Sequence, residues 1–117
     1  MLADNAPPAT GRAMGLPEGW ELAPVAKYSA SQTPGEVIIK AIGEHPSSNY
    51  EAKLFQSPLR IWPPQYLLGR HKTGDMGAQV ITPFEAMASF KATEKVKQIR
   101  ITDGGGAHDV TVDQARD

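Results

Sequence analysis

The stretch Glu36-Val37-Ile38-Ile39-Lys40-Ala41-Ile42 is the most apolar, β-branched run of the chain. β-Branched residues are enriched in strands, where their side chains pack on a pleated surface. Positions 37, 39 and 41 share one face of such a strand, and Ile38 and Ile42 add apolar groups to the other face beside Lys40. This pattern predicts a strand that is covered on both sides for much of its length.

The residues after this run predict a partner strand. Gly43 to Asn49 contains a proline and two serines and is typical of a long hairpin loop. The segment Tyr50 to Gln56 then alternates apolar and charged side chains, as in a half-buried antiparallel strand. We therefore expect 36–42 and 50–56 to pair as the central hairpin of the fold.

Turn residues divide the rest of the chain into short segments. The run 29–35 consists of small polar residues followed by Pro-Gly and predicts a loop. Residues 19–22 predict either a short edge strand or irregular chain, and 66–71 predict another strand. A second hairpin is predicted from 96–102 and 108–112, joined by an Asp-Gly-Gly-Gly turn.

Residues 83–92 fit two structures. A strand places Phe84, Phe90 and the alanines between them on one apolar face, over an unbroken alternation. A helix is favoured by Thr82 as N-cap, Pro83 at the first helical position and Glu85 in a capping box. We prefer the strand, because the two phenylalanines lie on different faces of a helix. The alternative is one helix over about 83–95.

The pattern of about seven short strands predicts an all-β, immunoglobulin-like, two-sheet antiparallel β-sandwich. An α+β fold with one helix at about 83–95 is the alternative. Residues 1–19 are rich in Pro and Gly and predict a flexible N-terminal arm, followed by a single domain over 20–117.

Composition excludes several classes of function. The chain has 117 residues, 12 Lys and Arg against 13 Asp and Glu, and no cysteine. A near-neutral charge argues against nucleic-acid binding, and the lack of cysteine removes disulfides and thiolate chemistry. No apolar run is long enough for a membrane helix, and the N-terminus lacks the features of a secretory signal. We expect a soluble, cytoplasmic protein; an exported protein whose signal was trimmed is the alternative.

The three histidines are the candidate metal ligands. His45 and His108 lie in predicted hairpin loops, and His71 ends a predicted strand. No two of them are spaced as a local ligand pair. A metal site therefore requires the loops to converge, with Asp75 or Asp109 as a further ligand.

No catalytic or cofactor motif is present. The chain lacks the Gly-x-Ser-x-Gly elbow of serine hydrolases. A nucleotide site requires a helix or Lys-Ser/Thr after its glycines, and neither follows Gly104-Gly105-Gly106. We expect a turn at these glycines, no cofactor and no enzymatic activity.

The segment Trp62-Pro63-Pro64-Gln65-Tyr66 contains a PPxY pattern, which WW domains read in polyproline II conformation. The competing interpretation is a stiff crossing between strands, with Trp62 and Tyr66 in the core. Trp62, Pro63, Pro64 and Tyr66 are therefore the candidate partner-binding residues.

These observations favour a non-enzymatic protein-interaction or assembly module that binds another protein or itself. A metal- or small-ligand-binding domain that uses His45, His71 and His108 is the alternative function.

Overall fold

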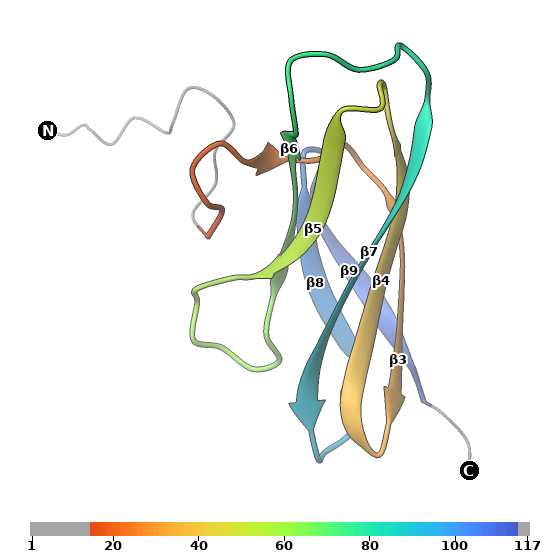
Figure 1. The fold of residues 1–117 in the computed structure, drawn as a ribbon. Helices are drawn as coiled ribbons and strands as arrows, with labels where there is room; N and C mark the ends of the chain where they lie inside the picture. Colours follow the sequence, from red (N-terminus) through yellow and green to blue (C-terminus); the bar gives the residue numbers. More distant parts are fainter. Residues whose placement is uncertain (1–14, 115–117) are drawn as a thin grey trace, which may run out of the picture.

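The computed structural model describes residues 15–114, and in this range the chain forms eight β-strands and no helix (Figure 1). The all-β prediction is therefore confirmed. The strands are β2 (Glu21–Leu22), β3 (Lys27–Thr33), β4 (Gly35–His45), β5 (Tyr50–Gln56), β6 (Tyr66–Lys72), β7 (Thr82–Ala92), β8 (Gln98–Asp103) and β9 (Gly106–Gln114).

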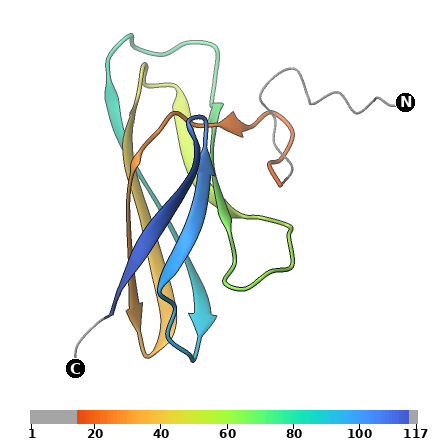
Figure 2. The same cartoon turned by 180° about the vertical axis from the view of Figure 1, so that it is seen from behind.

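The strands form one curled, mixed sheet in the order β2-β6-β8-β9-β3-β4-β7, with β5 also paired to β6. Figures 1 and 2 show this curl from opposite sides, with β8 and β9 behind β4 and β7 in the first view. The pairs β3–β9 and β6–β8 are parallel, so the prediction of a purely antiparallel sandwich is wrong. Alternation of apolar residues reports which face of a strand is buried, but it does not report the direction of its neighbours.

β9 joins the two halves of the curl. Residues 106–111 pair with β8, whereas residues 112–114 pair with β3. One strand therefore takes part in two ladders, and the two halves remain continuous through it. The layers of a separate two-sheet sandwich are replaced by a half-barrel.

Two pairing predictions need correction. Residues 29–33, expected in a loop, lie in β3, between β4 and β9. Their side chains are small and polar, yet Ala30 and Gln32 point inward and are buried, so tertiary pairing overrides low intrinsic preference. The predicted central hairpin is also wrong, because β4 pairs with β3 and β7 while β5 pairs with β6.

Residues 82–92 form strand β7, which confirms the strand interpretation and excludes the helix at 83–95. β7 pairs with β4 along its full length, from Thr82 opposite His45 to Ala92 opposite Gly35. Eleven paired residues supply a ladder that outweighs the helix propensity of Glu85 to Ala88. The hairpin of β8 and β9 is likewise confirmed, with the turn at Gly104 and Gly105.

The core lies inside the curl. Val37, Ile39 and Ala41 of β4 are fully buried and pack with Leu68 of β6 and Ile101 of β8. The opposite face of β4 is not covered as predicted, because Ile42 is 47% exposed. The strand is thus half-buried in the manner of an antiparallel sheet with one solvated face.

Leu16 packs on the sheet: it is 4% exposed and lies against the backbone of Gly69 in β6. Leu16 lies within the stretch 1–19 that was predicted as a flexible arm. Residues 1–14 of the predicted arm and residues 115–117 lie outside the described range. Within that range the structure contains no helix that is able to cross a membrane.

β5 and β7 lie side by side where the curl approaches closure (Figure 1). Within residues 15–114 no backbone ladder joins them, since β5 pairs with β6 and β7 with β4. We call this line of contact the β5–β7 seam. At the end where both strands begin, which we call the apical end, His45 packs on Tyr50 of β5 and Phe84 of β7. Near the other end of β7, Phe90 contacts Trp62 and Tyr66, which follow β5 in the chain.

Candidate functional site: an exposed tryptophan at the seam

The connection from β5 to β6, residues 57–65, carries an exposed apolar surface. Leu59, Ile61 and Trp62 are 53%, 46% and 54% exposed. The base of the loop is closed by a hydrogen bond of 2.7 Å from the Ser57 amide to the Gln65 carbonyl oxygen. The loop contains three prolines, which restrict its backbone. Three large apolar groups are therefore presented to solvent by a defined loop.

Trp62 rests on β7. Its ring meets Phe90 edge-on, with 5.7 Å between the centroids and an angle of 90° between the planes. Tyr66 packs on the same phenylalanine at 6.2 Å. Edge-to-face pairs of this kind are worth about 0.5–1.5 kcal/mol beyond the area they bury. Phe90 thus holds the indole in place while leaving more than half of it accessible.

The four predicted partner-binding residues differ in how far they are exposed to solvent. Trp62 is exposed and Pro63 is partly buried, whereas Pro64 and Tyr66 are buried, with Tyr66 only 3% exposed. A WW domain needs to reach the tyrosine of PPxY, and here this side chain belongs to the core. The segment supplies one accessible anchor, Trp62, rather than a linear motif.

Two grooves of about 220 Å³ each flank Trp62. Lys91 and Glu94 line one, and Arg100 and Asp109 line the other. Arg100 and Asp109 form an ion pair of 3.0 Å between Nε and Oδ1. The indole therefore stands between two depressions whose charged residues are balanced in sign.

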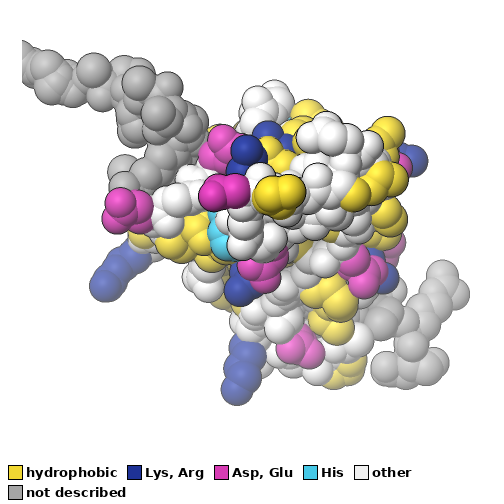
Figure 3. Space-filling model, turned by 45° about the horizontal axis from the view of Figure 1, so that its top comes forward, with side chains coloured by type: hydrophobic (Ala, Val, Ile, Leu, Met, Phe, Trp, Pro, Cys, Tyr) yellow, Lys and Arg dark blue, Asp and Glu magenta, His cyan; other side chains and the backbone are white. Residues whose placement is uncertain are grey.

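A second exposed apolar surface lies at the opposite end of the fold, in the loop from β6 to β7. Met76, Val80 and Ile81 are 89%, 53% and 65% exposed. Ser48 and Asn49 of the neighbouring loop hold this segment through hydrogen bonds to Ala78 and Gly74. Figure 3 views this end and shows hydrophobic side chains interspersed with charged ones. It offers no aromatic anchor comparable to Trp62.

His71 and His108 each contact a different carboxylate. His71 lies 2.9 Å from Glu51 Oε1 and stacks on Trp20, with the ring centroids 4.1 Å apart. The hydrogen bond from His71 lowers the pKa of Glu51. His108 lies 2.9 Å from Asp103 at the turn between β8 and β9.

His45 is at the apical end of the seam and is 2% exposed. Its ring stacks on Phe84 of β7 at 4.4 Å and on Tyr50 of β5 at 5.4 Å. Neither ring nitrogen has a hydrogen-bond partner among the described residues. Burial, together with the positive charge of Arg70, lowers the pKa of His45.

The three predicted metal ligands thus belong to three different neighbourhoods. Within residues 15–114, no group of three or more His, Asp or Glu side chains is arranged to hold a metal ion. The predicted three-histidine site gains no support from this arrangement.

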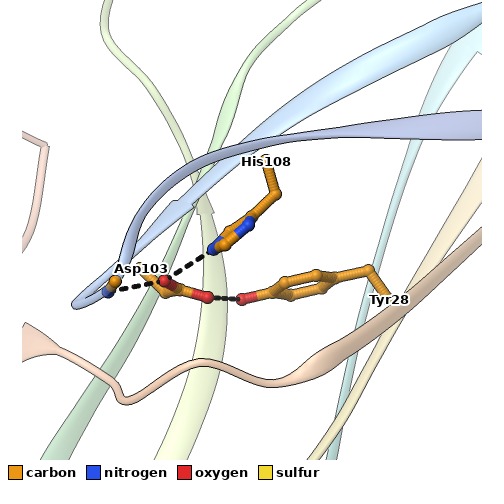
Figure 4. Close-up of polar contacts among 4 residues, drawn as sticks. Tyr28, Asp103 and His108 are labelled. Atoms are coloured by element: carbon orange, nitrogen blue, oxygen red, sulfur yellow. Dashed lines mark hydrogen bonds and ion pairs between the residues drawn. The ribbon is translucent and has the colours of Figure 1, made fainter.

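Sequence reasoning missed a polar network around Asp103 (Figure 4). Asp103 is 1% exposed and accepts hydrogen bonds from the Tyr28 hydroxyl at 2.5 Å, the Gly105 amide at 2.8 Å and the His108 ring at 2.9 Å. The bond to Gly105 is an Asx turn, which an Asp two residues before a glycine signals. Tyr28 has no such local signal.

The charges of this network follow from its geometry. Burial alone raises the pKa of Asp103, but the hydrogen bonds from Tyr28, His108 and Gly105 outweigh burial and hold that pKa below its usual range. Burial and the adjacent carboxylate raise the pKa of Tyr28 far above its ordinary value. The network therefore contains an ionised Asp103 and a neutral phenol.

The Asp–His contact has the form of a catalytic dyad, but a nucleophile is missing. Among the hydrogen bonds of residues 15–114, none joins His108 to a serine or threonine hydroxyl. Each acceptor oxygen of Asp103 is already engaged. The geometry supports a structural tie between the β8–β9 turn and β3.

Comparison with protein-family models, with curated proteins and with solved structures finds no match to this chain.

Proposed function

We propose that the protein is a binding module whose interface is centred on Trp62, with a protein as its partner. The observation that carries the proposal is the 54% exposure of an indole held edge-on by Phe90. Tryptophan is enriched among residues that dominate binding energy, and a rigid anchor loses little entropy on association.

The surroundings of Trp62 match the anatomy of a protein interface. Leu59 and Ile61 extend the apolar centre, and the two grooves give a partner access to both sides of the indole. Charged side chains surround this centre, as in the polar rim of protein interfaces. A partner with an apolar or aromatic group and a polar rim of its own fits this surface.

The charge balance favours a protein over other partners. Lys91 and Arg100 are offset by Glu94 and Asp109 around the indole, and the whole chain carries a formal charge of −1. Phosphate backbones and anionic lipid surfaces attract proteins through an excess of Lys and Arg. The two grooves beside Trp62 lack that excess, and exposed Arg60 adds a single further positive charge in the loop.

The test compares the wild-type chain with Trp62→Ser and with Val80→Ser, which alters an equally exposed apolar residue on the other surface. Each protein is used to capture partners from a lysate and is measured by light scattering across a concentration series. We expect Trp62→Ser to weaken the complex, or the self-association, by at least about tenfold, as for an interface hot spot. We expect Val80→Ser to leave the strength of the complex, or of the self-association, unchanged.

Equal capture and equal association by wild type and Trp62→Ser overturn the proposal. A wild-type chain that is monomeric and retains no partner overturns it as well. Trp62→Ser removes the contact with Phe90, worth about 0.5–1.5 kcal/mol, and also the burial of nearly half of the indole, so the variant is less stable than wild type. Urea unfolding of each variant therefore separates loss of binding from loss of fold.

A further inference from the structure

One histidine ring packs between β5 and β7 at the apical end of the seam. His45 ends β4, yet it packs against Tyr50 of β5 and Phe84 of β7, the two strands that no ladder joins. Phe84 in turn lies over Gly43, where an added Cβ would come within 2.8 Å of its ring. Ring packing therefore joins β5 and β7 at this end, beside the hydrogen bonds that link Ser48 and Asn49 to the β6–β7 loop.

The environment of His45 accepts a neutral ring and opposes a charged one. Both ring nitrogens are buried and have no hydrogen-bond partner among the described residues, so a charge on the ring is neither hydrogen-bonded by the protein nor exposed to solvent. The faces of Phe84 and Tyr50 attract a cation by only about 0.5–2 kcal/mol, less than the cost of burying an unpaired charge. The charged side chain that acts on it is Arg70 of β6, a cation, whose guanidinium lies 4.6 Å from the ring centroid of Tyr50.

Asp75 and Lys72 line a depression beside Tyr50 that His45 does not line, and no carboxylate of the described residues compensates for a proton on His45. Arg70 is paired with Glu21 of β2 through Nε and Oε2 at 2.9 Å, so this carboxylate is already engaged. Glu44, the neighbour of His45 on its own strand, is exposed and alternates to the opposite face of the sheet. Protonation therefore favours states in which the ring leaves the seam and reaches water.

We propose that His45 is a pH-sensitive latch, and that its protonation opens the β5–β7 seam at the apical end. Above the ordinary histidine pKa of about 6.5 the ring is neutral in both states and the seam is closed. Below it, the open state takes up a proton that the closed state does not. The opening equilibrium then rises by up to about tenfold per pH unit until the closed state also binds the proton.

Hydrogen exchange measured by mass spectrometry between pH 5 and pH 8, corrected for intrinsic exchange rates, tests the latch on the full chain. We expect wild-type protection in peptides covering β5 and the first half of β7 to fall steeply below pH 6.5. Peptides from β3, which contains no histidine, serve as the internal reference and follow a shallower course.

His45→Phe is the matched variant, since it keeps an aromatic ring and removes the titration. We expect its β5 and β7 peptides to lose the steep pH dependence. His45→Leu provides the same comparison with a smaller side chain, because the slope with pH, rather than absolute protection, decides the question. A wild-type slope equal to that of either variant overturns the latch, as does wild-type protection that is independent of pH.

Discussion

The hydroxyl of Tyr28 donates a hydrogen bond to the buried carboxylate of Asp103, across 75 residues of sequence. This contact ties the turn between β8 and β9 to the start of β3. β3 and β9 are parallel neighbours farther along the same sheet, so the bond closes one end of the curled half-barrel. A polar pair thus stabilises a junction that apolar packing leaves incomplete.

Tyr28→Phe is expected to lower the free energy of unfolding by about 1.5–3 kcal/mol, because the bond involves an ionised acceptor. Urea denaturation measures the change. Ser29→Ala, at the adjacent exposed position, serves as the control and stays within about 0.5 kcal/mol. Equal effects of the two substitutions would contradict the role assigned to Tyr28.

Acid is expected to remove the contribution of Asp103. The folded-state pKa of this carboxyl lies below its unfolded value, so its contribution is present above about pH 4 and is lost as the pH falls through the folded-state pKa. Unfolding free energies of wild type and Asp103→Asn, measured from pH 5 to pH 2, check this. The wild-type curve falls more steeply; parallel curves would exclude the linkage.

Alkali is expected to destabilise the fold above about pH 10. Burial raises the folded-state pKa of both Tyr28 and Tyr66, so the unfolded chain releases these protons first and stability declines as the pH rises past 10. Tyrosinate absorbance and circular dichroism, followed together, report this coupling. Ionisation of these two residues without loss of the strand signal would argue against it.

The two faces of β4 are expected to respond differently to truncation. Ile39 is fully buried, whereas Ile42 is 47% exposed on the same strand. Ile39→Ala leaves a cavity and costs about 2–5 kcal/mol, while Ile42→Ala stays within about 0.5 kcal/mol. Chemical denaturation of the two variants checks which face of β4 points into the core. Similar losses of stability would place the sheet in a different register.

Gly43 is expected to tolerate no side chain. A Cβ there meets Cε2 and Cζ of Phe84 at 2.8 Å, so Gly43→Ala displaces the ring that His45 packs on and costs about 1–3 kcal/mol. A Cβ added at Gly74 would have no atom within 4 Å, so Gly74→Ala is expected to change stability little. Thermal unfolding with near-ultraviolet circular dichroism distinguishes them. A neutral Gly43→Ala would mean that Phe84 does not lie over this glycine.

The candidate site was only partly predictable from sequence. Trp62 and Tyr66 stand four residues apart and were nominated together, but one is exposed and the other belongs to the core. The difference arises because Tyr66 begins β6, while Trp62 lies in the loop before it. Likewise, His45 and His108 both read as loop histidines, and nothing local distinguishes the buried, unpartnered ring from the one that contacts Asp103.

Sequence alone indicated that most of the described chain forms strands, while β3 was missed and the helix at 83–95 stayed open. Period-two alternation identified β5 and the inward face of β7, and the Asp-Gly-Gly-Gly run identified the turn between β8 and β9. Tertiary structure decided which strands pair, in which direction, and that β5 and β7 meet without a ladder. The reason is physical: alternation depends on each strand's own contact with the core, whereas pairing and the burial of His45 depend on residues distant in the chain.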